Sequence, residues 1–342
     1  MKKIYRGDKE MKLLHIAEAD SRFPTEGPFL DALREFGELT VIRNDGTMTD
    51  EEMASHIREH DVLLTIWGSS PVPEQIAQNP GRLSYICNIS GGIKGWIPLS
   101  IIEAGIPVTN WGDAIAADVA EAAFTLLLAS LKELLPQQLA VRSGGWHRND
   151  RRVGMMYGLR IGIYGMGVIG RKFVDFLRPF ECHIHYYDPY LSSTTTLEGC
   201  KRYDSLVELA ADCDVLVIHA GLTEETRNSV NAEVLSHLAD YSIVINTARG
   251  DIIDQDALFA ELQAGRLRAG LDVIADNDRL AEDHPARMWP NVLFTAHDLF
   301  YATWNMPKLQ RYERICLDNL QRFREGKPLL FKFDRDRYLR ST

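Results

Sequence analysis

Short runs of β-branched and other apolar residues alternate along most of the chain with stretches in which apolar residues recur at helical spacing. The first pattern predicts strands and the second predicts helices. In the first third of the chain, strands are predicted at 12–17, 39–42, 62–67, 83–89 and 106–109, and helices at 28–36 and 49–60. Strands that alternate with helices in this way are typical of a parallel sheet covered by helices on both faces.

The same alternation continues through the rest of the chain. Strands are predicted at 161–164, 184–187, 214–219, 242–246, 268–272 and 292–295, which is the number of strands in a full doubly wound dinucleotide-binding fold. The segment 113–135 is rich in Ala and Leu and apolar nearly all round, so we expect a long helix buried between domains or subunits. An amphipathic helix is predicted at 307–324, and we expect it to return to the first domain.

The strand at 161–164 leads directly into a glycine-rich turn, Gly165-Met166-Gly167-Val168-Ile169-Gly170, after which the chain becomes helical. Gly165 permits the tight turn, Gly167 lets a pyrophosphate approach the backbone, and Gly170 allows close packing of helix on strand. The phosphates would bind the free amides at the helix N-terminus. Because strand, glycines, helix and second strand occur in the required order, the motif favours a dinucleotide site over an ordinary strand-turn-helix.

Asp188 ends the second strand of this predicted fold. An acid at this position can accept hydrogen bonds from a ribose diol, and its charge would repel the 2′-phosphate of NADP. Residues 189–192 contain no Arg or Lys that would offset this repulsion. The sequence therefore predicts NAD as the cofactor.

Composition narrows the possible function classes. With 342 residues the chain is long enough for two domains, and its net charge of −10 disfavours a nucleic-acid partner. No apolar run has the length of a membrane span, and the N-terminus lacks a signal-peptide pattern. The five cysteines have no paired spacing, which argues against disulfides and against a metal site. We expect Cys87 and Cys213 to be buried thiols, in a protein of the reducing cytoplasm.

Two side chains that follow predicted strands are candidates for chemistry. Arg249 comes directly after the strand at 242–246, where an open α/β sheet binds ligands, and its guanidinium can hold a carboxylate in a two-pronged pair. The alternative is a surface arginine paired with Asp251 or Asp254. His297 follows the last predicted strand and could supply the proton that reduction of a ketone requires, although a lone histidine there is more often structural.

Further motifs extend along the chain beyond the glycine turn: Tyr187-Asp-Pro189, His219 with Leu222-Thr-Glu-Glu-Thr-Arg-Asn228, Asn246-Thr-Ala-Arg-Gly-Asp-Ile-Ile-Asp254, Gly270-Leu-Asp-Val273, Asp283-His-Pro285 and Pro290-Asn-Val-Leu-Phe-Thr-Ala-His297. Together with the glycine turn, they resemble the D-isomer-specific 2-hydroxyacid dehydrogenase family over nearly the whole chain. The resemblance implies an α/β protein with two doubly wound parallel-sheet domains. A NAD-binding Rossmann domain at 113–301 would be inserted in a flavodoxin-like substrate domain formed by 1–112 and 302–342.

The resemblance also implies an activity and a set of site residues. The activity is NAD-dependent interconversion of a small 2-oxo acid and its D-2-hydroxy acid, usually by a homodimer. The loop Ser90-Gly91-Gly92 matches the family's carboxylate-binding loop, to which Arg249 would add a guanidinium. The implied cofactor-binding residues are Gly165, Met166, Gly167, Val168, Ile169, Gly170, Asp188, His219, Ala220, Thr247, Ala248, Arg249, Asp272 and His297.

The family's catalytic set is an arginine, a glutamate and a histidine, and Arg249 and His297 match the first and the last. The glutamate is missing. Counting forward from the Asp272 motif places it at Asn277, whereas counting back from the 283–285 motif places it at Asp278. We prefer Asp278, with Asn277 and Asp276 as alternatives. Because aspartate is one methylene shorter than glutamate, we expect a longer contact with the histidine.

Other departures from the family pattern concern the substrate. Bulky Phe300 and Tyr301 follow the histidine where small residues are common, Gly221 replaces a common proline, and Lys94 replaces a common acid. The missing glutamate, together with bulky Phe300 and Tyr301, leaves two rival interpretations open. One is a dinucleotide-binding regulator with the same fold, and the other is a formate-dehydrogenase-like enzyme.

Overall fold

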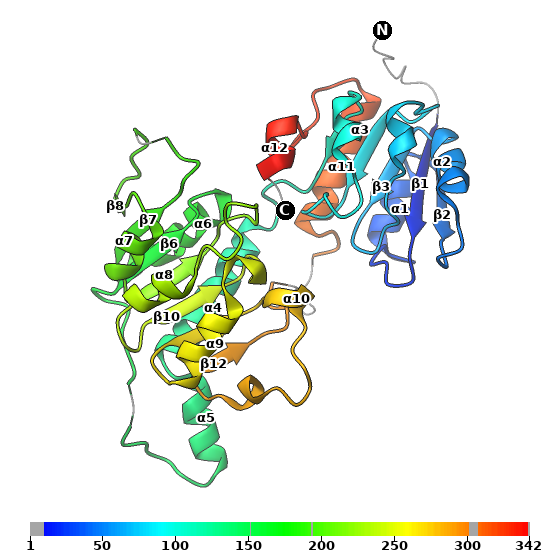
Figure 1. Ribbon diagram of the computed structural model, residues 1–342. Coiled ribbons are helices and arrows are strands. Elements are labelled where there is room, and N and C mark those ends of the chain that lie inside the picture. The colour runs from blue at the N-terminus through cyan, green and yellow to red at the C-terminus, as the bar shows by residue number, and fades with distance from the viewer. Residues whose placement is uncertain (1–9, 151, 193, 301–306, 341–342) are drawn as a thin grey trace. The chain divides into compact units, whose positions relative to one another are not determined.

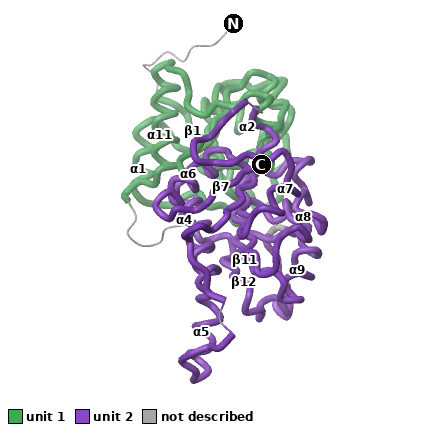
Figure 2. Tube along the Cα trace, turned by 90° about the vertical axis from the view of Figure 1, so that its left-hand side faces the viewer, with its two compact units in different colours: residues 1–115, 303–342 green, residues 116–302 purple. Residues whose placement is uncertain are grey.

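The chain folds into two compact units. Unit 1 comprises Met1–Ile115 and Thr303–Thr342, and unit 2 comprises Ala116–Ala302 (Figure 2). The structure is a computed structural model that describes residues 10–150, 152–192, 194–300 and 307–340 (Figure 1). Each unit has its own sheet and its own hydrophobic cores.

Unit 1 contains a five-stranded parallel sheet in the order β2-β1-β3-β4-β5. The strands are β1 Met11–Ala17, β2 Gly37–Arg43, β3 Val62–Thr65, β4 Tyr85–Asn88 and β5 Val108–Thr109. This 2-1-3-4-5 order is that of flavodoxin-like doubly wound sheets, which confirms the predicted fold class. Met11 pairs with Gly37, where a Cβ atom would lie only 2.1 Å from the Met11 carbonyl oxygen.

Helices cover both faces of this sheet. They are α1 Pro28–Arg34, α2 Asp50–Arg58, α3 Leu99–Glu103, α11 Arg311–Arg324 and α12 Arg335–Arg340, with a 3-10 turn η1 at Glu74–Ala77. Helices α1 and α11 contribute to the core on one face, and α2, α3 and α12 contribute to the core on the other. The amphipathic helix α11 thus returns to unit 1, as its pattern predicted.

Unit 2 contains a seven-stranded parallel sheet in the order β12-β11-β10-β9-β6-β7-β8. The strands are β6 Arg160–Tyr164, β7 His183–Tyr187, β8 Cys200–Arg202, β9 Val215–Ile218, β10 Ile243–Asn246, β11 Arg268–Leu271 and β12 Val292–Phe294. If the strands are numbered from β6 and read from β8 to β12, the order is 3-2-1-4-5-6-7. This is the Rossmann order 3-2-1-4-5-6 with β12 added at the end. All six predicted strands are present. The sheet also contains one strand that was not predicted, β8, which is a short Cys-Lys-Arg edge strand without a hydrophobic pattern.

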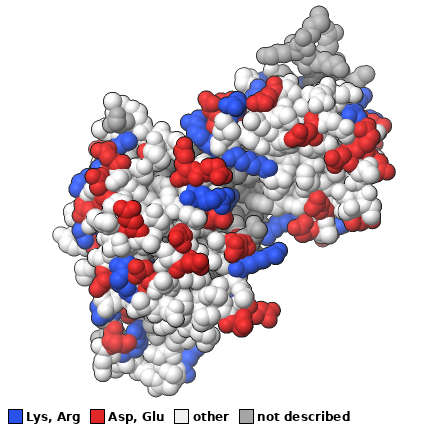
Figure 3. Space-filling model, in the orientation of Figure 1, with Lys and Arg blue, Asp and Glu red and all other residues white. Residues whose placement is uncertain are grey.

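The helices of unit 2 are α4 Ala116–Leu131, α5 Leu134–Arg142, α6 Val168–Leu177, α7 Leu206–Ala211, α8 Ala232–His237, α9 Gln255–Gln263 and α10 Ala275–Asp278, with 3-10 turns η2 Arg178–Phe180, η3 Gly250–Ile252 and η4 Pro285–Met288. Helices α4 and α6 pack on one face of the sheet, and α7, α8 and α9 pack on the other. Acidic and basic side chains are interspersed over the face shown in Figure 3. In the described part of the chain, no helix is both long and apolar enough to cross a bilayer.

The expected single helix over 113–135 is two helices. Helix α4 ends at Leu131, Glu133 adopts a left-handed conformation with φ of 51°, and α5 begins at Leu134. Pro136 lies in the first turn of α5, where its missing N–H costs no helical hydrogen bond. The apolar side chains of α4 are buried in the core of unit 2 itself, whereas α5 buries none of its residues.

Candidate active site

The glycine turn lies at the carboxyl end of β6, as predicted. A Cβ atom at Gly165 would lie 2.4 Å from the Ala220 amide nitrogen, and one at Gly170 would lie 2.4 Å from the Gly165 carbonyl oxygen. Both glycines are therefore required by the fold itself. Gly167 differs, because nothing lies within 4 Å of its Cβ position and its φ is an ordinary −72°. The open space beside Gly167 fits a ligand that approaches the N-terminus of α6 from outside.

Asp188 follows β7 and faces this turn. Its carboxylate is buried and accepts hydrogen bonds from the amides of Met166 at 2.8 Å and Tyr190 at 2.9 Å. Each carboxylate oxygen can accept more than one hydrogen bond, so a ribose diol remains a possible further partner. A pocket of about 400 Å³ opens at the ends of β6 and β7; its lining includes Tyr164, Tyr187, Pro189, Glu225 and Thr226.

Two buried polar side chains lie at the neighbouring ends of β9 and β10. Among the described residues, neither ring nitrogen of His219 has a hydrogen-bond partner, and the Thr247 hydroxyl has none either. Burial lowers the pKa of His219 to about 3, so the ring is neutral, and it packs edge-on against Phe173. Buried polar groups without partners are uncommon in folded proteins. Together with the space at Gly167, they fit a dinucleotide bound along this edge.

The loop after β10 presents Arg249. The Asn246 side chain closes this loop, because its Nδ2 donates to the Arg249 carbonyl at 2.9 Å and its Oδ1 accepts from the Ala248 amide at 3.0 Å. At Gly250 a Cβ atom would lie 1.8 Å from the Ile274 carbonyl carbon, so only glycine lets α10 pack against this loop. Burial lowers the pKa of Arg249, and the charge of Asp278 acts in the opposite direction.

The acids that could have made Arg249 an ordinary surface residue have other partners. Asp251 pairs with Arg227 at 3.2 Å, and Asp254 caps α9 by accepting from the Ala257 amide at 3.1 Å. The alternative that Arg249 serves only to neutralise one of these acids is therefore not favoured by the geometry.

His297 follows β12, and its Nδ1 lies 2.7 Å from Oδ2 of Asp278. The other oxygen of Asp278 accepts from the Ile274 amide at 2.8 Å. Burial would raise the pKa of Asp278, but the hydrogen bonds from His297 and Ile274 and the charges of His297 and Arg249 hold it below its usual value. With Nδ1 engaged by a carboxylate, Nε2 is the nitrogen that can donate a proton elsewhere.

The expectation of a long contact at Asp278 is wrong. Asp278 and Asp276 both adopt positive φ, 61° and 57°, which brings the short side chain within hydrogen-bond distance of the ring. His297 is itself left-handed, with φ of 58°. Its ring lies 6.2 Å from that of Phe300, whereas Tyr301 lies outside the described residues. The side chain of Asn277 is also outside the described part of the chain.

The turn that carries His297 is held by Asp272. The Asp272 carbonyl accepts from the His297 amide at 2.7 Å, and its carboxylate accepts from the Thr295 hydroxyl at 2.5 Å and the Leu299 amide at 3.4 Å. The sequence motifs contained Asn246 and Thr295, but nothing in their spacing indicated that these side chains fix the two loops.

The loop Ser90-Gly91-Gly92 follows β4 in unit 1. All three carbonyls are held by side chains or backbone of the same unit: Asn88 binds those of Ser90 and Gly92, and Asn110 binds that of Gly91. Lys94, which replaces the family's acid, donates to the Leu339 carbonyl of α12 at 3.0 Å. This loop belongs to a different unit from Arg249 and His297, so the geometry of each group stands by itself.

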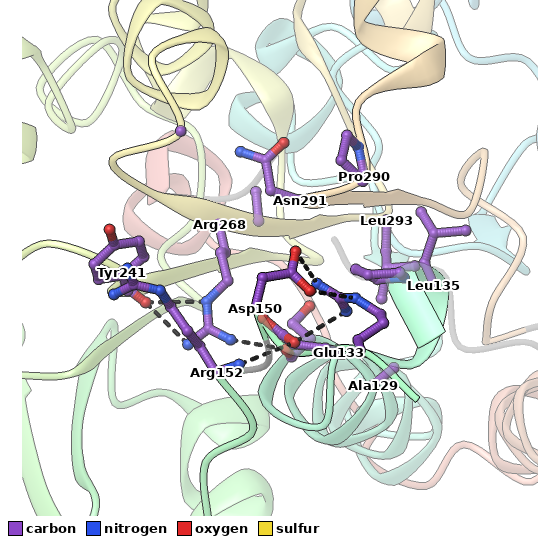
Figure 4. A pocket seen from close by; sticks show the side chains of 15 residues that line it. Ala129, Glu133, Leu135, Asp150, Arg152, Tyr241, Arg268, Pro290, Asn291 and Leu293 are labelled. Carbon is purple, nitrogen blue, oxygen red and sulfur yellow. Dashed lines mark hydrogen bonds and ion pairs between the residues drawn. The ribbon is translucent and has the colours of Figure 1, made fainter. Parts of the chain in front are cut away.

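A separate pocket of about 190 Å³ lies at the amino ends of the strands of the unit 2 sheet, opposite to the end that carries the glycine turn (Figure 4). Its lining includes Tyr241 and Arg268 near the amino ends of β10 and β11, and Arg148 and Glu133, which form an ion pair at 3.2 Å. The guanidinium of Arg152 stacks on the Tyr241 ring at 3.4 Å. None of the predicted site residues lines this pocket. In the described part of the chain, no three His, Cys, Asp or Glu side chains are grouped to hold a metal.

Comparison with known proteins agrees with this arrangement. Residues 124–298 match the family model described as D-isomer specific 2-hydroxyacid dehydrogenase, NAD binding domain. The chain is 30% identical to glyoxylate/hydroxypyruvate reductase HPR3 of Arabidopsis thaliana, over 90% of this chain and 94% of that protein. It is 29% identical to D-3-phosphoglycerate dehydrogenase of Methanocaldococcus jannaschii over 80% of its own length, and spans only 52% of that relative.

The fold comparison gives the same result. The 2-hydroxyacid dehydrogenase of Ketogulonicigenium vulgare Y25 superposes with a TM-score of 0.78 at 25% identity, covering 95% of this chain and 98% of that one. Members of the family are oxidoreductases that interconvert 2-oxo acids and D-2-hydroxy acids with a nicotinamide cofactor. On its sequence, its two doubly wound sheets and the match to the NAD-binding domain, the chain belongs to the D-isomer specific 2-hydroxyacid dehydrogenase family.

Proposed function

We propose that this protein reduces a small 2-oxo acid to its D-2-hydroxy acid with NADH. Arg249, Asp278 and His297 of unit 2 would be the catalytic residues, and the Ser90–Gly92 loop of unit 1 would be a carboxylate-binding loop. The observation that carries the proposal is the hydrogen bond of 2.7 Å between His297 and Asp278, at the same sheet edge as Arg249. Unit 1 would be the substrate domain and unit 2 the NAD-binding domain.

Each residue has a role that follows from its chemistry. Arg249 would bind the substrate carboxylate and polarise the adjacent carbonyl. The amides of the Ser90–Gly92 loop in unit 1 would bind a substrate carboxylate. His297 would donate a proton from Nε2 to the carbonyl oxygen, while Asp278 holds the ring and stabilises its charged form. The cofactor, when bound, supplies the hydride.

The glycine turn and the neighbouring strand ends would hold the cofactor. Residues Gly165 to Gly170 and the N-terminus of α6 would bind the pyrophosphate. Asp188 would bind the adenosine ribose. The ends of β9, β10 and β11, with His219, Ala220, Thr247, Ala248 and Asp272, would line the rest of the cofactor site.

A panel of 2-oxo acids tests this function. Purified protein is incubated with NADH and glyoxylate, hydroxypyruvate, pyruvate or phenylpyruvate, and loss of NADH absorbance is followed. We expect at least one acid to be reduced. NADH binding without oxidation of NADH by any acid would favour the regulator, and formate-dependent reduction of NAD would favour the formate-dehydrogenase-like enzyme.

We further propose that the protein is a homodimer. The helix that first suggested this, α4, is buried within its own unit, but α5 and the segment after it leave apolar side chains exposed. Leu134 is 55% exposed, Leu139 45% and Trp146 79%. Figure 2 shows α5 projecting from the body of unit 2. Several exposed apolar side chains on one projecting segment favour a second copy of the chain as its partner.

Light scattering at micromolar concentration tests the homodimer. We expect twice the mass of the chain, and we expect Leu139→Asp together with Trp146→Ser to give a monomer that remains folded. A monomeric wild-type protein would refute the proposal. The cytoplasm is the proposed location, because all five cysteines are free thiols, as a reducing compartment maintains them.

A further inference from the structure

The side chain of Asn88 is the centre of the hydrogen bonds around the Ser90–Gly92 loop. Asn88 is the last residue of β4 and is 1% exposed. Its Nδ2 donates to the Ser90 carbonyl at 2.7 Å and to the Gly92 carbonyl at 3.2 Å. One buried amide group therefore holds two of the three carbonyls of the loop.

The orientation of this amide group is fixed from its other side. Oδ1 of Asn88 accepts from the Thr65 hydroxyl at 2.9 Å and from Nε1 of Trp96 at 3.1 Å. An indole N–H can only donate, so it requires an oxygen opposite it. Nδ2 must then face the loop.

The held carbonyls determine where the loop amides point. In a trans peptide the carbonyl and the N–H of one peptide unit point in opposite directions. The carbonyls of Ser90 and Gly92 face Asn88, and that of Gly91 faces Asn110 at 2.7 Å. The amides of Gly91 and Ile93 therefore face away from Asn88, and the amide of Gly92 faces away from Asn110. Within the described ranges, no protein group accepts a hydrogen bond from these three amides.

We propose that Asn88 is the positioning residue of the carboxylate site: by holding the carbonyls of Ser90 and Gly92 it aims the amides of Gly91 and Ile93 at the substrate carboxylate. Successive backbone amides aimed at one point form an anion-binding concavity. The inference rests on the proposed function and extends it, because Asn88 acts through the loop without touching the substrate. The substrate class is then any acid with a carboxylate next to its carbonyl.

Asn88→Asp tests the proposal with almost no change in shape. The variant loses both N–H donors and places a carboxylate against the Ser90 and Gly92 carbonyls, so those peptides should turn. The matched control is Asn319→Asp, because Asn319 is also fully buried in unit 1 and holds the backbone of Leu330 through both its side-chain atoms. Both variants bury a new carboxylate, but only the first one affects the loop.

Two measurements are made on the full-length protein. Calorimetry gives the affinity for oxamate, an unreactive 2-oxo acid analogue, in the presence of NADH. Steady-state kinetics with glyoxylate separates KM from kcat. For Asn88→Asp we expect oxamate affinity to fall and KM to rise by about tenfold or more, with NADH affinity within about twofold of wild type. For Asn319→Asp we expect a lower melting temperature and unchanged oxamate affinity.

The outcomes distinguish this inference from the proposed function. Equal oxamate affinity in wild type and Asn88→Asp would overturn the role of Asn88, even if the enzyme is active. Equal losses of affinity in the two variants would also overturn it, because the effect would then be general destabilisation. If wild type binds oxamate in an Asn88-dependent way but reduces no 2-oxo acid, the proposed reaction fails while the carboxylate site stands. If wild type binds no oxamate, the inference is wrong.

Discussion

Nδ1 of His297 and Oδ2 of Asp278 lie 2.7 Å apart, although both residues adopt left-handed backbone conformations. Left-handed conformations cost free energy for residues other than glycine and are often found at functional sites. Here they let a short acid reach the ring from α10, which Gly250 allows to pack against the Arg249 loop. The pair is thus built by the backbone as much as by the two side chains.

Replacing Asp278 with Asn tests the charge of this pair. The amide can still orient the ring, but it stabilises the charged imidazole less. We expect reductive turnover to fall by about tenfold to hundredfold. Because the pKa of Asp278 is below its usual value, its own ionisation does not limit activity at neutral pH in the wild type. A wild-type turnover rate in the variant would contradict the pairing.

Removing the imidazole should have a larger effect. We expect His297→Ala to bind NADH with nearly wild-type affinity and to reduce the preferred 2-oxo acid about a hundredfold to ten-thousandfold more slowly. Fluorescence titration with NADH and single-turnover kinetics provide the two measurements. A wild-type rate with the true substrate would show that His297 is not the proton donor.

The elements were predictable where local pattern and topology agree. Residues 161–170 combine an apolar run with three spaced glycines, and they form β6 and the start of α6 as expected. Strand β8 was not predictable, because Cys200, Lys201 and Arg202 pair only through their backbone at the sheet edge. The break at Glu133 was also missed, since an Ala- and Leu-rich segment gives no signal for a single left-handed residue.

The site was predictable in part for a similar reason. Arg249 and His297 directly follow strands, so their position along the chain places them at one sheet edge. Counting forward from the Asp272 motif missed their partner by one residue, because the segment after β11 bends through two left-handed aspartates and its length is not set by a regular element. Counting back from the 283–285 motif gave Asp278, the acid that lies against His297. The role of Asn88 could not be predicted for another reason: the orientation of its amide group is fixed by Thr65 and Trp96, which are close in space but lie 23 and 8 residues away along the chain.

Arg249→Lys should separate two-pronged binding from charge. Lysine keeps the positive charge but cannot bind a carboxylate with two parallel hydrogen bonds. We expect KM for the 2-oxo acid to rise about tenfold or more and kcat to fall, with NADH affinity retained. Guanidinium ion added to Arg249→Ala should restore part of the activity, which a purely structural role would not allow.

The buried His15 predicts that stability falls in mild acid. Its ring nitrogens bind the Leu64 carbonyl and the Ser21 hydroxyl, each at 3.0 Å, and burial lowers its pKa to about 4. Below pH 6.5 the unfolded chain takes up a proton that the folded chain excludes. The contribution of His15 to the unfolding free energy is therefore complete above pH 6.5. It is lost as the pH falls towards 4, and the total loss is about 3 kcal/mol.

Urea unfolding at pH 7 and pH 5 measures this effect. We expect the unfolding free energy of wild type to fall between these values, and that of His15→Gln to fall less. The difference between wild type and His15→Gln in the change of unfolding free energy with pH isolates His15 from the other acid-sensitive groups, such as His219. Parallel slopes would show that His15 is protonated in the folded state.

Cofactor choice gives the last prediction. The carboxylate of Asp188 is fixed by the amides of Met166 and Tyr190, and the Tyr190 hydroxyl donates to Glu225 at 2.7 Å. A 2′-phosphate bound near Asp188 would thus face a carboxylate that cannot turn away, with Glu225 as a second acid nearby. Repulsion between like charges of this kind costs several kcal/mol, so we expect kcat/KM to favour NADH over NADPH by roughly a hundredfold or more.

Two variants separate charge from shape in this preference. Asp188→Asn keeps an oxygen for one backbone amide and removes the negative charge, so the preference for NADH should shrink mainly through a lower KM for NADPH. Asp188→Ser with Tyr190→Arg also breaks the contact with Glu225 and adds a positive charge for the phosphate, so it should weaken the preference further or reverse it. Should the wild-type protein use NADPH as well as NADH, Asp188 does not face the ribose, and the cofactor lies elsewhere along the ends of β6 and β7.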